Sequence, residues 1–218
     1  MLDRAKKADI IRSGLNYWLG NGQLVLRSYG KEGDRRFADV ESAVGDYANV
    51  SNEGRLADKF KTCLSQFALA LWKLDGEDGL RRFNSVMEVA LPAGYDAAYG
   101  DQRETGVDGF LTYVVRRDIM LGMKAGGWKT SDSKFSYWIE DPFAVLKDEL
   151  TEDAYQVIST HGYVAIKMRY FFGSRAKLWH VHLEESPWRG KQRSLWEMEI
   201  PEGRHPKELR KALQFAAA

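Results

Sequence analysis

Residues 163–200 read YVAIKMRYFFGSRAKLWHVHLEESPWRGKQRSLWEMEI and contain the strongest β-strand pattern in the chain. Apolar side chains alternate with others over Tyr163–Phe172, Lys177–Glu184 and Ser194–Ile200, and glycine or proline separates these segments. Alternation with a period of two is typical of strands that bury one face. The pattern therefore predicts three consecutive strands that pair as an antiparallel meander.

The rest of the chain is mainly helical in pattern. The clearest helix covers residues 55–74, where apolar side chains recur at helical spacing and form one stripe: Leu56, Phe60, Leu64, Phe67, Leu71 and Leu74. We also expect a helix over 3–19 that ends at Gly20-Asn21-Gly22, because these residues favour helix termination. Short strands are predicted over 23–29 and 110–116.

Together these elements predict an α+β fold with a helical N-terminal part and a C-terminal antiparallel meander packed on helices. Residues 1–91 form the mainly helical part, and 92–108, with three glycines, form a loop or boundary. Residues 109–218 form a mixed part that ends in a helix from Pro206 to about Phe215. The two parts could also be one continuous domain.

The composition is that of an ordinary globular protein, with 44% hydrophobic and 29% charged residues. The 32 basic and 31 acidic side chains give a net charge of +1, so any functional charge must be local. Cys63 is the single cysteine, which excludes an internal disulfide and a thiolate zinc site. We expect no cofactor.

The chain has no long apolar segment and no secretory leader pattern near its first residue. These features predict a cytoplasmic protein that does not associate with membranes.

The solvent face of the predicted meander collects side chains of three kinds. Basic and aromatic residues come from the first strand, histidines from the second and acids from the third. They are Tyr163, Lys167, Arg169 and Phe171, then His180, His182 and Glu184, then Glu197 and Glu199. A solvated face with cross-strand charge pairs is one interpretation.

A nucleic-acid surface is the functional interpretation that we favour at this point. Residues 161–193 contain seven basic but only two acidic side chains, and aromatic residues are interleaved with them. Cations would neutralise phosphates while aromatic rings stack on bases, whether DNA or RNA. The candidate contacts are Tyr163, Lys167, Arg169, Phe171, Arg175, Trp188, Arg189, Lys191 and Arg193. Such a protein would be non-catalytic and part of a larger complex.

Two further functions remain open, so the sequence does not settle whether the protein is an enzyme. His180 and His182 point the same way on one strand, and with Glu184 or Glu199 they could serve a hydrolase or nuclease, with or without a metal. Alternatively, the protein is an inhibitor or adaptor that binds another protein through aromatic residues on the 92–108 loop and the Trp188 loop. A second basic and aromatic patch runs from Arg116 to Lys134 and includes Trp128. Within it Gly126-Gly127 could let a backbone approach a phosphate, but a plain turn between two elements is the interpretation that we favour.

Overall fold

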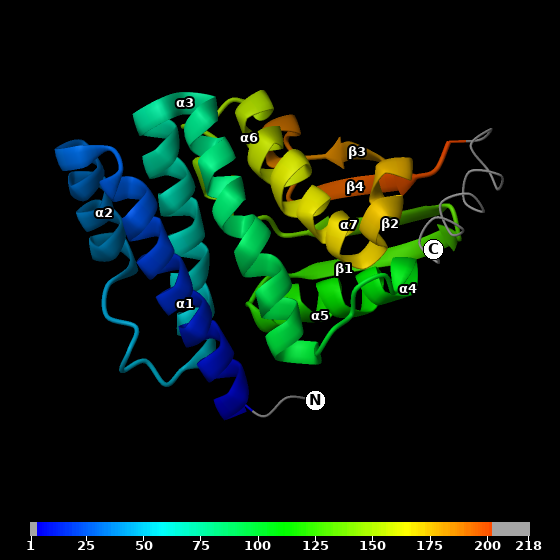
Figure 1. Cartoon of the computed structure of the whole chain (residues 1–218), viewed down its shortest axis with the longest axis horizontal. Coiled ribbons are helices and arrows are strands. Elements are labelled where there is room, and N and C mark those ends of the chain that lie inside the picture. The colour runs from blue at the N-terminus through cyan, green and yellow to red at the C-terminus, as the bar shows by residue number, and fades with distance from the viewer. Residues whose placement is uncertain (1–3, 202–218) are drawn as a thin grey trace, which may run out of the picture.

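We analysed a computed structural model of the chain, which describes residues 4–201. As the sequence predicts, the fold is α+β, with helices in the N-terminal half and an antiparallel sheet in the C-terminal half (Figure 1). The N-terminal helices are α1 (Arg4–Arg27), α2 (Gly30–Val44) and α3 (Glu53–Tyr99). Side chains from both halves form one continuous hydrophobic core.

Helix α3 confirms the apolar stripe, since Leu56, Phe60 and Leu71 are all buried. Asn52 caps the start of the helix, because its side chain accepts a hydrogen bond from the Arg55 amide at 3.0 Å. Non-helical backbone at Asp75 and Gly76, where Gly76 has φ of 56°, divides α3 into two arms. Both arms pack against the core.

The prediction that Gly20-Asn21-Gly22 ends the first helix is wrong, as is the strand over 23–29. Helix α1 continues through these glycines to Arg27. Gly22 is buried, and a Cβ there would lie 2.1 Å from the Phe67 ring of α3. The glycine therefore permits close contact between two helices rather than a turn.

The predicted loop over 92–108 is shorter in the structure. Helix α3 continues past Pro92 to Tyr99, because buried Leu91 and Tyr95 hold this arm against the core. The loop itself runs from Gly100 to Thr105, and helix α4 (Gly106–Gly109) follows. The proposed division of the chain at this point stays a prediction.

The sheet has four antiparallel strands in the order β1-β2-β4-β3. They are β1 (Ala125–Ser131), β2 (Lys134–Ile139), β3 (His180–Glu185) and β4 (Ser194–Glu199). The predicted turn at Gly126-Gly127-Trp128 is thus an edge strand. Alternate side chains of β2 and β4, including Tyr137 and Trp196, are fully buried beneath the helices.

The helices that cover this sheet either precede β1 or lie between β2 and β3 in sequence. A π-helical turn, η1 (Phe110–Val114), leads into α5 (Val115–Met120), and a 3-10 turn, η2, covers Ala144–Leu146. A second helical run consists of α6 (Glu152–Ile158), the π-helical turn η3 (Ser159–Val164) and α7 (Ala165–Phe172). Figure 1 shows α6 and α7 lying across the strands. Two 3-10 turns, η4 (Gly173–Leu178) and η5 (Pro187–Arg189), flank β3.

The predicted strands over 163–172 and 110–116 are both wrong, because these segments are helical. Residues 163–172 are apolar or aromatic at nearly every position, and eight of the ten side chains are buried. The two that are not buried, Ala165 and Arg169, lie four residues apart on one side of a helix. Lys167 is charged but buried, so in the sequence it completes a false alternation of apolar and polar residues. The meander therefore lacks its first predicted strand, and β2 pairs with β4 instead.

The predicted helix from Pro206 to Phe215 lies outside the described residues. Between residues 4 and 201, no helix has the combined length and hydrophobicity that a membrane span requires.

Candidate functional site

The residues of the predicted first strand do not form a surface. Tyr163 and Phe171 are buried, and Lys167 is completely inaccessible to solvent. Arg169, by contrast, is half exposed and pairs with Glu88 of α3 at 2.7 Å. Tyr163, Lys167 and Phe171 point into the core from one side of the helix, whereas Arg169 points to solvent, so the exposed face that the sequence predicted does not exist.

Lys167 belongs to a buried polar cluster that sequence analysis missed. Its Nζ donates to Asp118 Oδ2 at 3.0 Å and to the Tyr137 hydroxyl at 3.1 Å. The hydroxyls of Tyr137 and Tyr163 also donate to Asp118, so the carboxylate has three donors. Burial lowers the pKa of Lys167 to about 8, against the opposing effect of Asp118. The cluster ties α7, α5 and β2 together within the core.

Most other cations of the predicted nucleic-acid site bind protein acceptors. Arg189 pairs with Glu152 at 2.6 Å, and Arg193 pairs with Glu185 at 2.9 Å. Arg175 donates to the backbone carbonyl of Glu104 at 3.2 Å. Lys191 is exposed. The surplus of positive charge over residues 161–193 is therefore largely compensated by contacts that the linear sequence does not reveal.

Trp188 does not extend from its loop as a free stacking residue. Its ring stacks on Tyr155 with centroids 4.1 Å apart, and its Nε1 donates to the Leu150 carbonyl at 2.7 Å. These contacts anchor the loop to α6. Of the nine residues predicted to bind nucleic acid, the structure brings none into a shared exposed cationic and aromatic patch.

The histidines and acids of the last two strands, however, do share one face. The register pairs His180 with Glu199 and His182 with Glu197. Lys134 of β2 reaches the same face and pairs with Glu197 at 2.6 Å and Glu199 at 3.5 Å. No group of three or more side chains suited to holding a metal ion occurs within residues 4–201.

Two tryptophans complete this face: Trp128, which the sequence places beside a predicted turn, and Trp138, which the sequence analysis does not single out. Trp138 lies over Gly126 of the neighbouring strand, where a Cβ would be 2.7 Å from the indole nitrogen. The Arg193 guanidinium lies 5.4 Å from the Trp138 ring centroid on the same face. Trp128 is paired with Ser136 across the β1–β2 ladder and is 46% exposed. Trp138 could have been placed on this face from the sequence, because it lies on the opposite side of a strand from the apolar Phe135 and Tyr137.

We call this surface the open sheet face. It consists of Trp128, Lys134, Trp138, His180, His182, Glu185, Leu195, Glu197 and Glu199, with the buried Ser136 beneath them. Arg193 pairs with Glu185 on this face, which leaves the carboxylates of Glu197 and Glu199 opposed by the single ammonium group of Lys134. Its shape is that of a broad sheet surface rather than an enclosed pocket.

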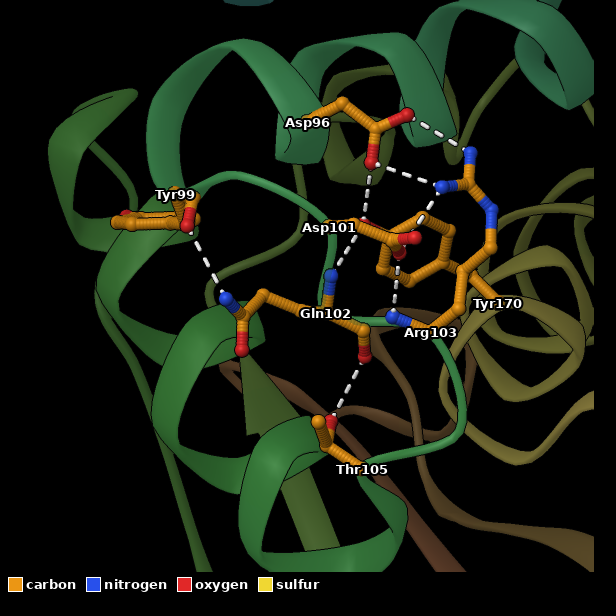
Figure 2. Close-up of polar contacts among 7 residues, drawn as sticks. All are labelled: Asp96, Tyr99, Asp101, Gln102, Arg103, Thr105 and Tyr170. Atoms are coloured by element: carbon orange, nitrogen blue, oxygen red, sulfur yellow. Dashed lines mark hydrogen bonds and ion pairs between the residues drawn. The ribbon is translucent and has the colours of Figure 1, made fainter.

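A second polar assembly surrounds the Gly100–Thr105 loop (Figure 2). The Tyr170 hydroxyl donates to Asp96 Oδ1 at 2.6 Å and accepts from the Gln102 amide at 3.2 Å. Arg103 pairs with Asp96 at 2.7 Å and with Asp101 at 2.9 Å. The Arg103 guanidinium also lies 5.1 Å from the Tyr170 ring centroid. This network holds the loop in one conformation against α3 and α7.

No protein-family model, curated protein or solved structure gave a significant match to this chain. The function must therefore be inferred from the geometry of these residues.

Proposed function

We propose that the protein binds a basic protein partner through the open sheet face. The observation that carries this proposal is the acidic row Glu197 and Glu199 on the inner strand β4, which shares a face with exposed histidines and the exposed Trp128. Broad surfaces with aromatic residues are typical of protein recognition, in which tryptophan is over-represented among energetically dominant contacts. The partner would supply lysine or arginine side chains.

The charge of the face supports a cationic partner. Lys134 is shared between Glu197 and Glu199, so one ammonium group opposes two carboxylates. A partner's cation could pair with the remaining negative charge, and a guanidinium could stack on Trp128. Phosphates of a nucleic acid would be repelled by the same carboxylates.

A direct test uses a synthetic peptide of alternating lysine and glycine as the probe. We expect saturable changes in the amide NMR shifts of β2 and β4, with an affinity that falls as salt is added. The double variant Glu197→Gln with Glu199→Gln should bind the peptide about tenfold more weakly or worse. Trp128→Ala should also weaken binding while the fold is retained, because this side chain is already half exposed.

The matched control removes two carboxylates elsewhere, in Glu77→Gln with Asp78→Asn on α3. Both of these acids are exposed partners of Arg81. Equal loss of peptide binding in the two double variants would contradict the proposal, since it would indicate a response to net charge alone.

Nucleic-acid binding stays a prediction, which the exposed cations Lys177 and Lys191 would have to support. A single-stranded oligonucleotide provides the comparison. Tight, salt-sensitive binding that is lost in Lys177→Ala with Lys191→Ala would favour the nucleic-acid function over the acidic-face proposal. Arg189 and Arg193 are poorer targets because their ion pairs would be lost too.

The hydrolase or nuclease alternative also stays a prediction. Its candidate residues His180 and His182 are exposed, with ring centroids 6.3 Å apart. Divalent-ion titration monitored at these imidazoles tests the metal-dependent form.

A further inference from the structure

A cavity of about 470 Å³ lies between α3, the Gly100–Thr105 loop and the end of α7. This is within the range of small-ligand sites. Its apolar lining comes from Pro92 and Ile166, and its polar lining includes Glu88, Glu104 and Tyr170. The cavity is separate from the open sheet face, because none of its lining residues belongs to the sheet.

Several polar contacts tie the loop that borders the cavity to its neighbours. Tyr170 and Arg103 both bind Asp96, and the Thr105 hydroxyl donates to the Gln102 carbonyl at 2.8 Å (Figure 2). The loop backbone is further tied to α7 by the Glu104 amide, which donates to the Tyr170 carbonyl at 3.3 Å. A ligand would therefore meet a preformed wall.

Glu104 is the unusual residue of this wall. It has φ of 62°, and it is the single non-glycine residue with positive φ among those described. Its carboxylate lies against Gly173, where a Cβ would be 2.5 Å from Oε1. A side chain at position 173 would therefore displace the carboxylate from its place beside the cavity.

The electrostatics around Glu104 favour a cation. Gly173 follows the last residue of α7, and the carbonyl groups at the end of a helix carry partial negative charge. The negative charge of a carboxylate beside these carbonyl groups is therefore unfavourable. Arg175 donates to the backbone carbonyl of Glu104. None of the ion pairs formed within residues 4–201 includes the Glu104 carboxylate.

The arginines that border the cavity are already compensated. Arg169 pairs with Glu88 at 2.7 Å, and Arg103 pairs with both Asp96 and Asp101. An anionic ligand would have to displace these carboxylates, whereas a cationic ligand would meet Glu104 directly.

We propose that this cavity binds an aliphatic ammonium group, with the charge beside Glu104 and the alkyl chain over Pro92 and Ile166. The ligand would be either a free alkylamine or the lysine side chain of a peptide. Both sources present the same chemistry, a primary ammonium on a flexible methylene chain.

The test titrates the isotope-labelled full chain with cadaverine, with Nα-acetyl-lysinamide and with glutarate. Glutarate has a similar length to cadaverine but the opposite charge. We expect saturable shifts at the amides of Glu104, Tyr170 and Gly173 with cadaverine and none with glutarate. Binding of acetyl-lysinamide as well would identify a lysine side chain as a ligand, and cadaverine binding alone would identify a free diamine.

Glu104→Gln should weaken cadaverine binding about tenfold or more, because a charge-assisted contact is lost. Glu77→Gln is the matched control, since it removes the same charge from an exposed position of α3 that lines neither the cavity nor the open sheet face, and it should leave the affinity unchanged. Absence of saturable shifts, binding of glutarate, or equal weakening in both variants would overturn the proposal. None of these outcomes depends on whether the open sheet face binds a protein, because that is tested with the β4 variants.

Discussion

Lys167 and Arg169 lie two residues apart on α7, yet their environments are opposite. Lys167 is fully buried with Asp118, while Arg169 pairs with Glu88 in partly exposed surroundings. An ion pair at the surface contributes little to stability because water screens it, whereas removing one partner of a buried pair leaves an uncompensated charge. The two residues therefore form a natural matched comparison.

We expect Lys167→Met to reduce the free energy of unfolding by about 3–5 kcal/mol. The physical reason is that Asp118 would keep its charge in the core but lose its ammonium partner. Urea denaturation of the wild type and the variant measures the difference.

Arg169→Met should change the same free energy by about 1 kcal/mol or less. Similar losses in both variants would show that Lys167 is not held in the buried cluster. The double variant Lys167→Met with Asp118→Asn should be less destabilised than the two single changes combined, since the buried charge is removed with its partner.

The positive φ of Glu104 is a second feature at this scale. Holding a residue with a side chain in this region costs about 1 kcal/mol or more, and glycine avoids that cost. We expect Glu104→Gly to raise the free energy of unfolding by about 1 kcal/mol while abolishing cadaverine binding. Glu104→Ala, which removes the carboxylate without relieving the backbone, should lose binding with no gain in stability. A gain in the alanine variant would assign the effect to the charge instead.

At the scale of the elements, helix α1 shows how one glycine can be required while its neighbour is not. Gly20 is exposed and has no atom within 4 Å of a Cβ, but Gly22 lies against Phe67. Both residues occupy the interior of the same helix, where glycine costs backbone entropy. Only the contact with α3 distinguishes them.

Gly20→Ala should therefore stabilise the protein by about 0.5–1 kcal/mol. Gly22→Ala should destabilise it by about 1–3 kcal/mol, because the methyl group would force α1 and α3 apart. Thermal unfolding of both variants checks the expected opposite signs. A stabilising Gly22→Ala would contradict the close helix contact.

Across the whole molecule, buried tyrosines link stability to alkaline pH. Burial is the main cause that raises the pKa of four of them well above its usual value of 10, and nearby Asp118 or Asp141 adds to the effect. They are Tyr95, Tyr137, Tyr155 and Tyr163. Above pH 10 the unfolded chain releases these protons while the folded protein retains them, so stability falls as pH rises.

Lys167 changes the stability with pH in the opposite direction to the tyrosines. Its pKa of about 8 in the folded state lies below the usual 10.5, so between these values the unfolded chain binds more protons and stability rises with pH. Above pH 10 the tyrosines outnumber this single group. We expect the free energy of unfolding to fall there by about 1.4 kcal/mol per pH unit for each proton that the folded protein holds in excess of the unfolded chain.

Urea denaturation at closely spaced pH values between 8 and 11 measures this slope. Tyr155→Phe should reduce it, because the variant has one fewer tyrosine to titrate. A free energy that stays constant or rises above pH 10 would contradict the buried, protonated state of these tyrosines.

Much of the fold and part of the site could be predicted from local patterns. Helix α3 has one buried and one exposed side, so its apolar residues recur with a helical period in the sequence. Strands β3 and β4 likewise have one buried and one open face. For this reason the shared face of His180, His182, Glu197 and Glu199 was predicted correctly.

The open sheet face also contains residues that no local pattern assigned to it. Trp128 and Lys134 reach it because β1 and β2 join the sheet from a distant part of the chain. Similarly, the cavity at Glu104 depends on the meeting of the Gly100–Thr105 loop with the end of α7. Such juxtapositions follow from long-range packing.

Local sequence patterns were sufficient to predict the α+β class, the apolar stripe of α3 and the alternating faces of β3 and β4. Each of these elements has one buried and one exposed side, so its apolar residues recur at a regular spacing. That residues 163–172 are helical followed only from long-range packing, because the charged Lys167 is buried against Asp118 and so completes a false alternation in the sequence. Packing also determined which cationic side chains form ion pairs within the protein. Lys167 and Arg169 find their carboxylates 49 and 81 residues away, and attraction between charges depends on distance in space, not along the chain.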